Sequence, residues 1–342
     1  MKDTAEATNA YAAKVIYGYL SAMQAEVEGV RTSADNEYIH RMRVATRRLR
    51  SALRIFRASF PRQEYKQYTK DIRAVTKALG EARDLDVHLE LLERLPPQFL
   101  DPPLSPGINR LRLRLKQQRQ QSQSSVIEAM TTLEEDQTLR KIARWASPWL
   151  QQSESFNLYS PHLYKLAFSS IKTRLEEMMV FDQSVRYEVN VSELHAMRIS
   201  AKRLRYTMEV FPDLYGEGMK PFINQTKKLQ DLLGSIHDAD VWIELIPNFI
   251  KEEQQRIQTY FGHTRPLRRL LPGLNALSAN RKSDRDEDYA SFIQEWDKTL
   301  ESGLWEKLGS LINAPLDIEE EIQLLPKTGS PDQQNPSQPP DL

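Results

Sequence analysis

Apolar positions along this chain recur at steps of three and four residues, which is the period of an amphipathic α-helix. In residues 38–60 one such stripe consists of Met42, Ala45, Leu49, Ala52, Leu53 and Phe56. Alternating Val, Ile and Thr stretches bounded by turn residues, which indicate strands, are nearly absent. Residues 110–115 alternate arginine with leucine as a strand would, but they run into a segment of helical composition. The pattern therefore predicts an all-α fold.

Prolines mark the interruptions of the helical pattern. Five prolines between residues 96 and 106 predict a loop near 96–107. Glycines, prolines and a charged run predict a further break near 262–285, from Gly262 to Arg285. Five more prolines lie in a tail rich in serine, glutamine and asparagine. We therefore expect residues 326–342 to be disordered.

Two motifs occur twice in the same order. HRMRVATRRLR at residues 40–50 returns as HAMRISAKRLR at 195–205, an offset of 155 residues, and the register still matches at Phe56 and Phe211. LGEARDLDV at 79–87 returns as LGSIHDADV at 233–241, an offset of 154 residues. Such self-similarity indicates an internal repeat. We predict two homologous halves, residues 1–150 and 155–325, related by a pseudo-twofold axis.

The first repeated motif carries a stripe of cations on the helix face away from its apolar stripe. At 100° per residue, the stripe consists of His40, Arg43, Arg47, Arg50, Arg54 and Arg57. Its counterpart in the second half consists of His195, Arg198, Lys202 and Arg205. The counterpart is shorter because Glu209 stands where the first half has Arg54.

No acid lies among residues 41–57, although like charges four residues apart on a helix repel each other. A multivalent anion would relieve that repulsion. Arginine suits the role, because its planar guanidinium makes bidentate hydrogen bonds to phosphate oxygens. Cations before the second motif extend the predicted binding surface, namely Lys70, Arg73, Lys77, Lys227 and Lys228.

The amino-acid composition excludes several classes of protein but assigns no function. The 342 residues contain 47 Lys+Arg and 47 Asp+Glu, so the formal net charge is zero. Cysteine is absent, which excludes disulfides, thiolate metal sites and cysteine nucleophiles. No stretch approaches the roughly 18 apolar residues of a membrane span, and the first residues lack the layout of a secretory signal. We expect a cytoplasmic protein with no membrane association.

Motifs for catalysis and for metal or cofactor binding are missing. The chain has no P-loop, dinucleotide fingerprint, nucleophile elbow or zinc-protease motif, so no catalytic residue, metal or cofactor is predicted. The pairs Asp84/Asp86 and Asp238/Asp240 resemble metal ligands, but side chains two residues apart on a helix diverge by about 200°. We expect structural salt bridges from them. The five basic residues within 110–119 are either solvent-facing or a secondary anion patch.

The repeated motifs resemble those of the CHAD family, the conserved-histidine α-helical domain. The resemblance covers residues 5–325 and rests on H-x-M-R-[VI]-x-x-[RK]-R-L-R and L-G-x-x-[RH]-D-x-D-V in both halves. It implies paired antiparallel helical bundles with internal twofold pseudosymmetry. It also implies binding of inorganic polyphosphate in a central basic groove or pore, in some members at polyphosphate granules. The residues to which it assigns this role are His40, Arg43, Arg47, Arg48, Arg50, His195, Arg198, Lys202, Arg203 and Arg205.

Several functions stay open at this point. The leading prediction is a non-catalytic module that binds polyphosphate. The alternatives are a metal-dependent phosphohydrolase or phospho-carrier that uses His40 or His195, a nucleic-acid-binding protein, and a scaffold. Neighbouring arginines should lower the pKa of a histidine, and a bound polyanion should reverse that shift. We therefore predict that binding takes up protons and weakens from about pH 6 to pH 8.

Overall fold

The computed structural model describes residues 2–32, 35–153 and 159–324. Within these ranges every regular element is a helix, which confirms the all-α prediction. The helices of the first part are α1 (Lys2–Gln24), α2 (Val27–Thr32), α3 (Asn36–Ile55), α4 (Arg62–Glu93), α5 (Ser105–Glu135) and α6 (Thr138–Gln152). Those of the second part are α7 (Pro161–Met179), α8 (Val191–Met208), α9 (Pro212–Tyr215), α10 (Lys220–Phe261), α11 (Leu271–Glu301) and α12 (Leu304–Leu324).

The two helices that carry the first repeated motif, α3 and α8, bury the face that their apolar stripes predict. In α3, Met42, Leu49 and Leu53 are fully buried, and the helix begins where the Asp35 side chain accepts a hydrogen bond from the Glu37 amide at 3.1 Å. In α8, Met197 and Leu204 occupy the equivalent positions and are also fully buried. The opposite faces of both helices are left to the cations.

A single large core joins the two parts of the chain. Tyr11, Phe56 and Phe211 meet there, with ring centroids between 6.0 and 6.3 Å apart. The Tyr11 hydroxyl donates a hydrogen bond to the carbonyl of Val210 at 3.2 Å. Phe56 and Phe211 are equivalent positions of the repeat, so equivalent residues contact each other at this point. The division into two halves and the pseudo-twofold axis themselves stay predictions.

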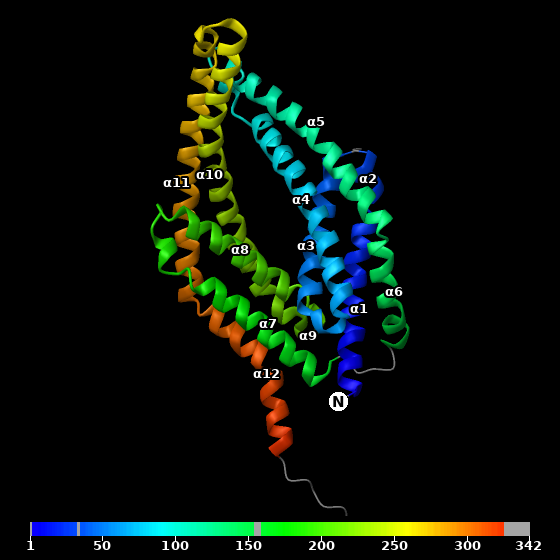
Figure 1. The fold of residues 1–342 in the computed structure, drawn as a ribbon. Coiled ribbons are helices and arrows are strands. Elements are labelled where there is room, and N and C mark those ends of the chain that lie inside the picture. The colour runs from blue at the N-terminus through cyan, green and yellow to red at the C-terminus, as the bar shows by residue number, and fades with distance from the viewer. Residues whose placement is uncertain (1, 33–34, 154–158, 325–342) are drawn as a thin grey trace, which may run out of the picture.

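A second, smaller core lies at the tips of two long helical hairpins. Figure 1 shows the hairpins α4/α5 and α10/α11 diverging from the base of the molecule and converging again at their tips. The contact is close: a Cβ at Gly107 would lie 2.2 Å from the Leu270 carbonyl oxygen, and one at Gly273 would lie 1.9 Å from that of Leu104. Only glycine permits backbones to approach so nearly. Apolar side chains around this contact include Leu92, Phe99, Trp242, Phe249 and Leu274.

The predicted chain breaks are partly right. α4 ends at Glu93 and α5 begins at Ser105, close to the predicted loop. The break near 262–285 is wrong beyond Leu270, because α11 runs without interruption from Leu271. Pro272 lies in the first turn of α11, where a proline removes no helical hydrogen bond. The predicted disordered tail lies outside the described residues.

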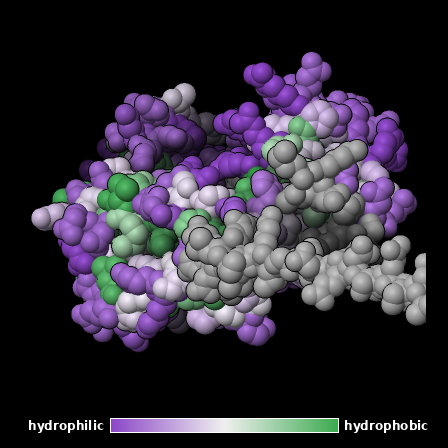
Figure 2. All heavy atoms as spheres, turned by 90° about the horizontal axis from the view of Figure 1, so that it is seen from below, coloured by the Kyte–Doolittle hydropathy of each residue, from purple (hydrophilic) through white to green (hydrophobic). Residues whose placement is uncertain are grey.

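The surface seen from below is mostly hydrophilic, with smaller hydrophobic areas among the polar side chains (Figure 2). None of the described helices combines the length and the apolar character that a membrane crossing requires.

Candidate anion-binding site

Four cations gather where α3 and α8 contact each other. Arg43 and Arg47 come from α3, and Arg198 and Lys202 come from α8; together they are named the basic cluster. Arg43 and Arg198 are equivalent positions of the repeat, as are Arg47 and Lys202. The contact between the two helices therefore brings the central parts of both predicted stripes to one place.

The pKa of Lys202 reflects both burial and the positive charge of the basic cluster. Burial, and then the charges of Arg198, Arg47 and Arg43, lower its pKa from 10.5 to about 7. Burial is also the largest cause of the lowered pKa values of Arg47 and Arg198; the charge of Arg43 lowers both further, and that of Arg198 lowers the pKa of Arg47. A shift of this kind arises where cations are buried together without enough opposite charge.

Two guanidinium groups of the basic cluster have unused donors. The Nε atoms of Arg47 and Arg198 are buried and have no hydrogen-bond partner in the described parts of the chain. A buried donor left without a partner costs about 1–3 kcal/mol. An anionic oxygen that reached the cluster would satisfy these donors and offset the repulsion among the four cations.

The acids nearest the cluster belong to the second repeated motif. Asp84 accepts a hydrogen bond from Arg43 at 2.8 Å, and Asp238 lies 3.9 Å from Arg198. These two carboxylates are more than half exposed, at 64% and 52%. They therefore balance only part of the cluster charge, and they do so from its solvent side.

The second aspartate of each pair forms a more buried ion pair. Asp86 accepts a hydrogen bond from Arg119 at 2.7 Å, and Asp240 accepts one from Arg285 at 2.5 Å. The expectation that the aspartate pairs form structural salt bridges is confirmed. α4 and α10 run on without a break through Gly80 and Gly234, and the described residues include no group of three or more potential metal ligands.

The two predicted histidines lie at the edge of the cluster in different surroundings. Burial and the charge of Arg83 lower the pKa of His40. His195 instead has its Nδ1 atom 3.0 Å from that of His237, which occupies the position equivalent to Arg83. Burial, and then Arg198, lower the pKa of His237 to about 4, and both also lower that of His195. The prediction that the pKa values of His40 and His195 are lowered is confirmed, but burial lowers them more than the neighbouring cations do.

Two predicted binding residues are instead held by a carboxylate of the protein itself. Glu209, which shortens the second stripe, accepts hydrogen bonds from Arg48 at 2.9 Å and from Arg205 at 2.6 Å. Arg205 also lies 4.6 Å over the ring of Tyr206, and Arg47 lies 5.7 Å over it. Arg48 therefore connects α3 to the end of α8, and both arginines border the cluster rather than belong to it.

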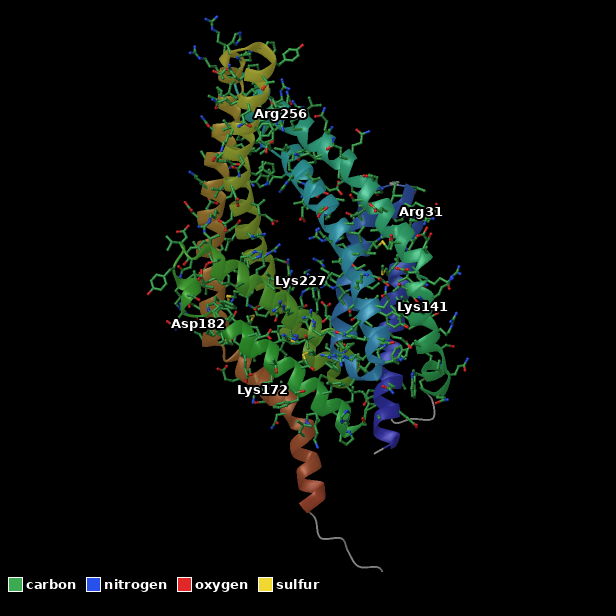
Figure 3. The ribbon with its side chains drawn as sticks, in the orientation of Figure 1. Arg31, Lys141, Lys172, Asp182, Lys227 and Arg256 are labelled. Carbon is green, nitrogen blue, oxygen red and sulfur yellow. The ribbon has the colours of Figure 1, made fainter. Side chains whose placement is uncertain are left out.

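The other predicted cations lie outside the cluster. Burial, then Arg54 and Arg73, lower the pKa of Arg50, so these three arginines form a neighbouring group. Lys228 pairs with Glu295 at 2.6 Å. Figure 3 shows Lys227 on the side of α10 toward α4. The remaining predicted residues are exposed on α4 and α8, namely Lys70, Lys77 and Arg203.

Three residues beside the cluster were not predicted as site residues. Arg83 and His237 occupy the variable position of the second motif, directly before its first aspartate. That repeated position was the available signal, since it faces His40 in one half and His195 in the other. Tyr206 had no such signal, because its role depends on where Arg47 and Arg205 meet across the two helices.

Four of the five basic residues within 110–119 have structural partners, Arg119 through its pair with Asp86. Arg114 donates to Glu253 at 2.8 Å, and the Nε atom of Arg110 lies 3.7 Å from the same carboxylate. Arg112 donates to the carbonyl of Leu92 at 3.0 Å. These three arginines stabilise the hairpin tips, which argues against an anion patch at this segment.

Fold and site together define an all-helical protein with a group of incompletely neutralised cations between two equivalent helices. A model of the CHAD domain matches residues 14–247, and the chain therefore belongs to the CHAD domain family. The CHAD domain from the plant Ricinus communis has a similar structure, with a TM-score of 0.57 and 22% identity over 83% of this chain and 91% of that one.

PptA from Streptomyces chartreusis is also similar in structure, with a TM-score of 0.60 and 15% identity over 85% of this chain and 99% of that one. At such identities the two structures support the fold alone. A comparison with curated proteins found no match.

Proposed function

We propose that this protein binds inorganic polyphosphate at the basic cluster and does not turn it over. The observation that carries the proposal is a pair of buried guanidinium Nε atoms, on Arg47 and Arg198, that have no hydrogen-bond partner among the described residues. They lie beside the half-buried Lys202. A ligand with closely spaced phosphate oxygens suits such a site. Membership of the CHAD domain family supports the same ligand class.

The proposed mechanism is electrostatic. Successive phosphates of an extended chain would accept hydrogen bonds from Arg47 and Arg198, while Arg43 and Lys202 add charge on either side. Each neutralised phosphate releases condensed counterions, so affinity should fall steeply with salt, as it does for nucleic acids. The same binding would bring this protein to polyphosphate granules in a cytoplasm that contains them.

Titration calorimetry with long-chain polyphosphate at two salt concentrations tests the proposal. The double variant Arg47→Gln/Arg198→Gln should bind at least about 100-fold more weakly, because each charge-assisted hydrogen bond contributes about 1.5–3 kcal/mol. The matched control is Arg140→Gln/Lys141→Gln on α6, which removes two exposed cations away from the cluster and should bind normally. Thermal unfolding of each variant confirms that the fold is retained.

Comparison ligands separate this function from the alternatives. Long-chain polyphosphate should bind more tightly than ATP or single-stranded RNA at equal salt. Tighter binding of RNA would favour a nucleic-acid-binding protein instead. Release of phosphate from polyphosphate or triphosphate in the presence of Mg²⁺ or Mn²⁺ would contradict the non-catalytic part of the proposal.

A further inference from the structure

A second group of arginines lies in a pocket of its own. The pocket has a volume of about 280 Å³ and lies between the C-terminal parts of α3 and α8 and the middle of α7. Arg54, Arg174 and Arg203 line it, one from each helix. None of the four residues of the basic cluster does.

Hydroxyl groups line the same pocket. Ser51 of α3 and Ser170 and Thr173 of α7 are among the lining residues. None of these three hydroxyls has a hydrogen-bond partner in the parts of the chain that the structure describes. Each is therefore available to donate to an oxygen of a ligand.

The charge of the pocket is positive. Two of its three guanidinium groups share one nearby carboxylate, that of Glu177, which accepts from Arg174 at 2.6 Å and lies 4.0 Å from Arg203. Arg54 has no ion pair within the described residues. Guanidinium and hydroxyl donors around one small cavity are the groups that recognise a phosphoryl oxygen cluster.

We propose that this pocket binds one terminal phosphoryl group. A terminal group presents three free oxygens and up to two negative charges, whereas a phosphate inside a chain presents two free oxygens and one charge. Three arginines and three hydroxyls match the terminal group better. The volume lies just below the usual range of about 300–1,000 Å³ for ligand pockets, which argues against a nucleoside as the occupant.

The pocket is placed to receive the end of a chain that is held at the basic cluster. Arg54 follows Arg47 by seven residues on α3, which is about 10 Å along a helix. Arg50 lies between them in sequence, and its pKa is lowered in part by Arg54. If the occupant is the end of a polyphosphate chain, this inference rests on the proposed function. A free phosphate or a small phosphate ester presents the same terminal group and does not depend on that function.

Linear tripolyphosphate and cyclic trimetaphosphate provide the test, since both contain three phosphates but only the linear one has terminal groups. Two variants alter the pocket: Arg54→Gln/Arg203→Gln removes charge, and Ser170→Ala/Thr173→Val removes hydroxyls at constant charge. By calorimetry, each should weaken the binding of tripolyphosphate about tenfold and leave trimetaphosphate unchanged. The control is Lys172→Gln, at an exposed lysine of α7 that does not line the pocket (Figure 3).

Orthophosphate distinguishes the two sources of the terminal group. Binding of orthophosphate that depends on Arg54 and Arg203 would show that a small phosphate suffices, and its absence beside binding of tripolyphosphate would identify the polymer end. If the pocket variants lose equal affinity for the linear and the cyclic ligand, or lose none for either, the proposal that the pocket binds a terminal phosphoryl group is wrong. If Arg47→Gln/Arg198→Gln binds long-chain polyphosphate as tightly as the unaltered protein, the proposed function is wrong, whatever the pocket variants do.

Discussion

Arginines gather both at the hairpin tips and at the contact between α3 and α8, but only the tips provide a fully buried carboxylate for them. At the tips, Glu253 is fully buried and accepts hydrogen bonds at 2.8 Å from Arg114 and from Arg256. In the basic cluster, Arg47 and Arg198 have buried Nε atoms without a partner among the described residues. Arg112 at the tips also has such an Nε atom, but its guanidinium donates to the Leu92 carbonyl at 3.0 Å, whereas those of Arg47 and Arg198 donate no hydrogen bond to any described residue. The same residue type is therefore structural in one region and available for a ligand in the other.

The difference lies in where the acids are. Glu253 comes from α10 and meets arginines of α5 at a fully buried position between the hairpins, so its charge holds the two helices together. Asp84 and Asp238 reach the basic cluster from its exposed side, where water screens their charges. A run of arginines thus indicates an anion site only where the fold brings no buried acid to it.

The largest effect is expected from Glu253→Gln. Removing one partner of a buried ionic group leaves the other charges uncompensated, and the free energy of unfolding should fall by about 3 kcal/mol. Urea denaturation measures this loss. The matched control is Glu252→Gln, whose exposed pair with Arg256 should contribute less than about 1 kcal/mol. Equal effects of the two variants would remove the distinction between the two regions.

Arg47→Gln should have little effect on stability and a large effect on binding. The substitution relieves repulsion from Arg43 and Arg198 while it forfeits a contact with the ring of Tyr206. The free energy of unfolding should therefore change by less than about 1 kcal/mol. Affinity for long-chain polyphosphate should fall about 10-fold or more. A large loss of stability with normal binding would make the basic cluster structural, like the tips.

Much of this contrast could be predicted from the sequence, because it depends on local pattern. The 3–4 spacing of apolar residues specifies which face of α3 and α8 is buried, and the repeat pairs Arg43 with Arg198 and Arg47 with Lys202. The aspartate pairs were correctly expected to form salt bridges, because helix geometry separates side chains two positions apart.

The rest depends on contacts between segments far apart in the chain. Glu209 lies 161 residues from Arg48, and Glu253 lies 139 residues from Arg114. No local pattern shows that these acids come to these arginines. The lowered pKa of Lys202 likewise requires three arginines from two helices around one buried amine.

Neutralising the exposed acids of the basic cluster should sharpen the contrast. Asp84→Asn/Asp238→Asn frees Arg43 and Arg198 from partial compensation, at roughly 0.5–1 kcal/mol for each exposed pair. Affinity for long-chain polyphosphate should rise up to about tenfold, and the gain should shrink at high salt. Calorimetry at two ionic strengths measures both. A loss of affinity would show that the aspartates position the arginines rather than compete with the ligand.

The smallest expected effect is a dependence of binding on pH that arises from Lys202. Burial, and then the charges of Arg198 of α8 and of Arg47 and Arg43 of α3, lower the pKa of this amine from 10.5 to about 7 on folding, against the opposing charge of Asp238 of α10. Between pH 7 and pH 10.5 Lys202 is protonated in the unfolded chain and mostly neutral in the folded protein, so the free energy of unfolding should rise with pH over this range. A bound anion favours the charged amine, so binding should take up a proton and weaken as pH rises above 7.

For one such group the affinity for long-chain polyphosphate should fall about fivefold from pH 7 to pH 8. Calorimetry in two buffers of different protonation enthalpy measures the proton uptake directly. Terminal phosphates also titrate, with a second pKa of about 6, but they are a small fraction of the phosphates in a long chain. Lys202→Met should bind more weakly and be nearly insensitive to pH in this range. His40→Ala/His195→Ala should keep most of the fall, because these histidines lie at the edge of the basic cluster, where a bound anion raises their lowered pKa values less than it raises that of Lys202. If the fall in affinity from pH 7 to pH 8 persists in Lys202→Met and is lost in His40→Ala/His195→Ala, the histidines and not Lys202 take up the proton when the ligand binds.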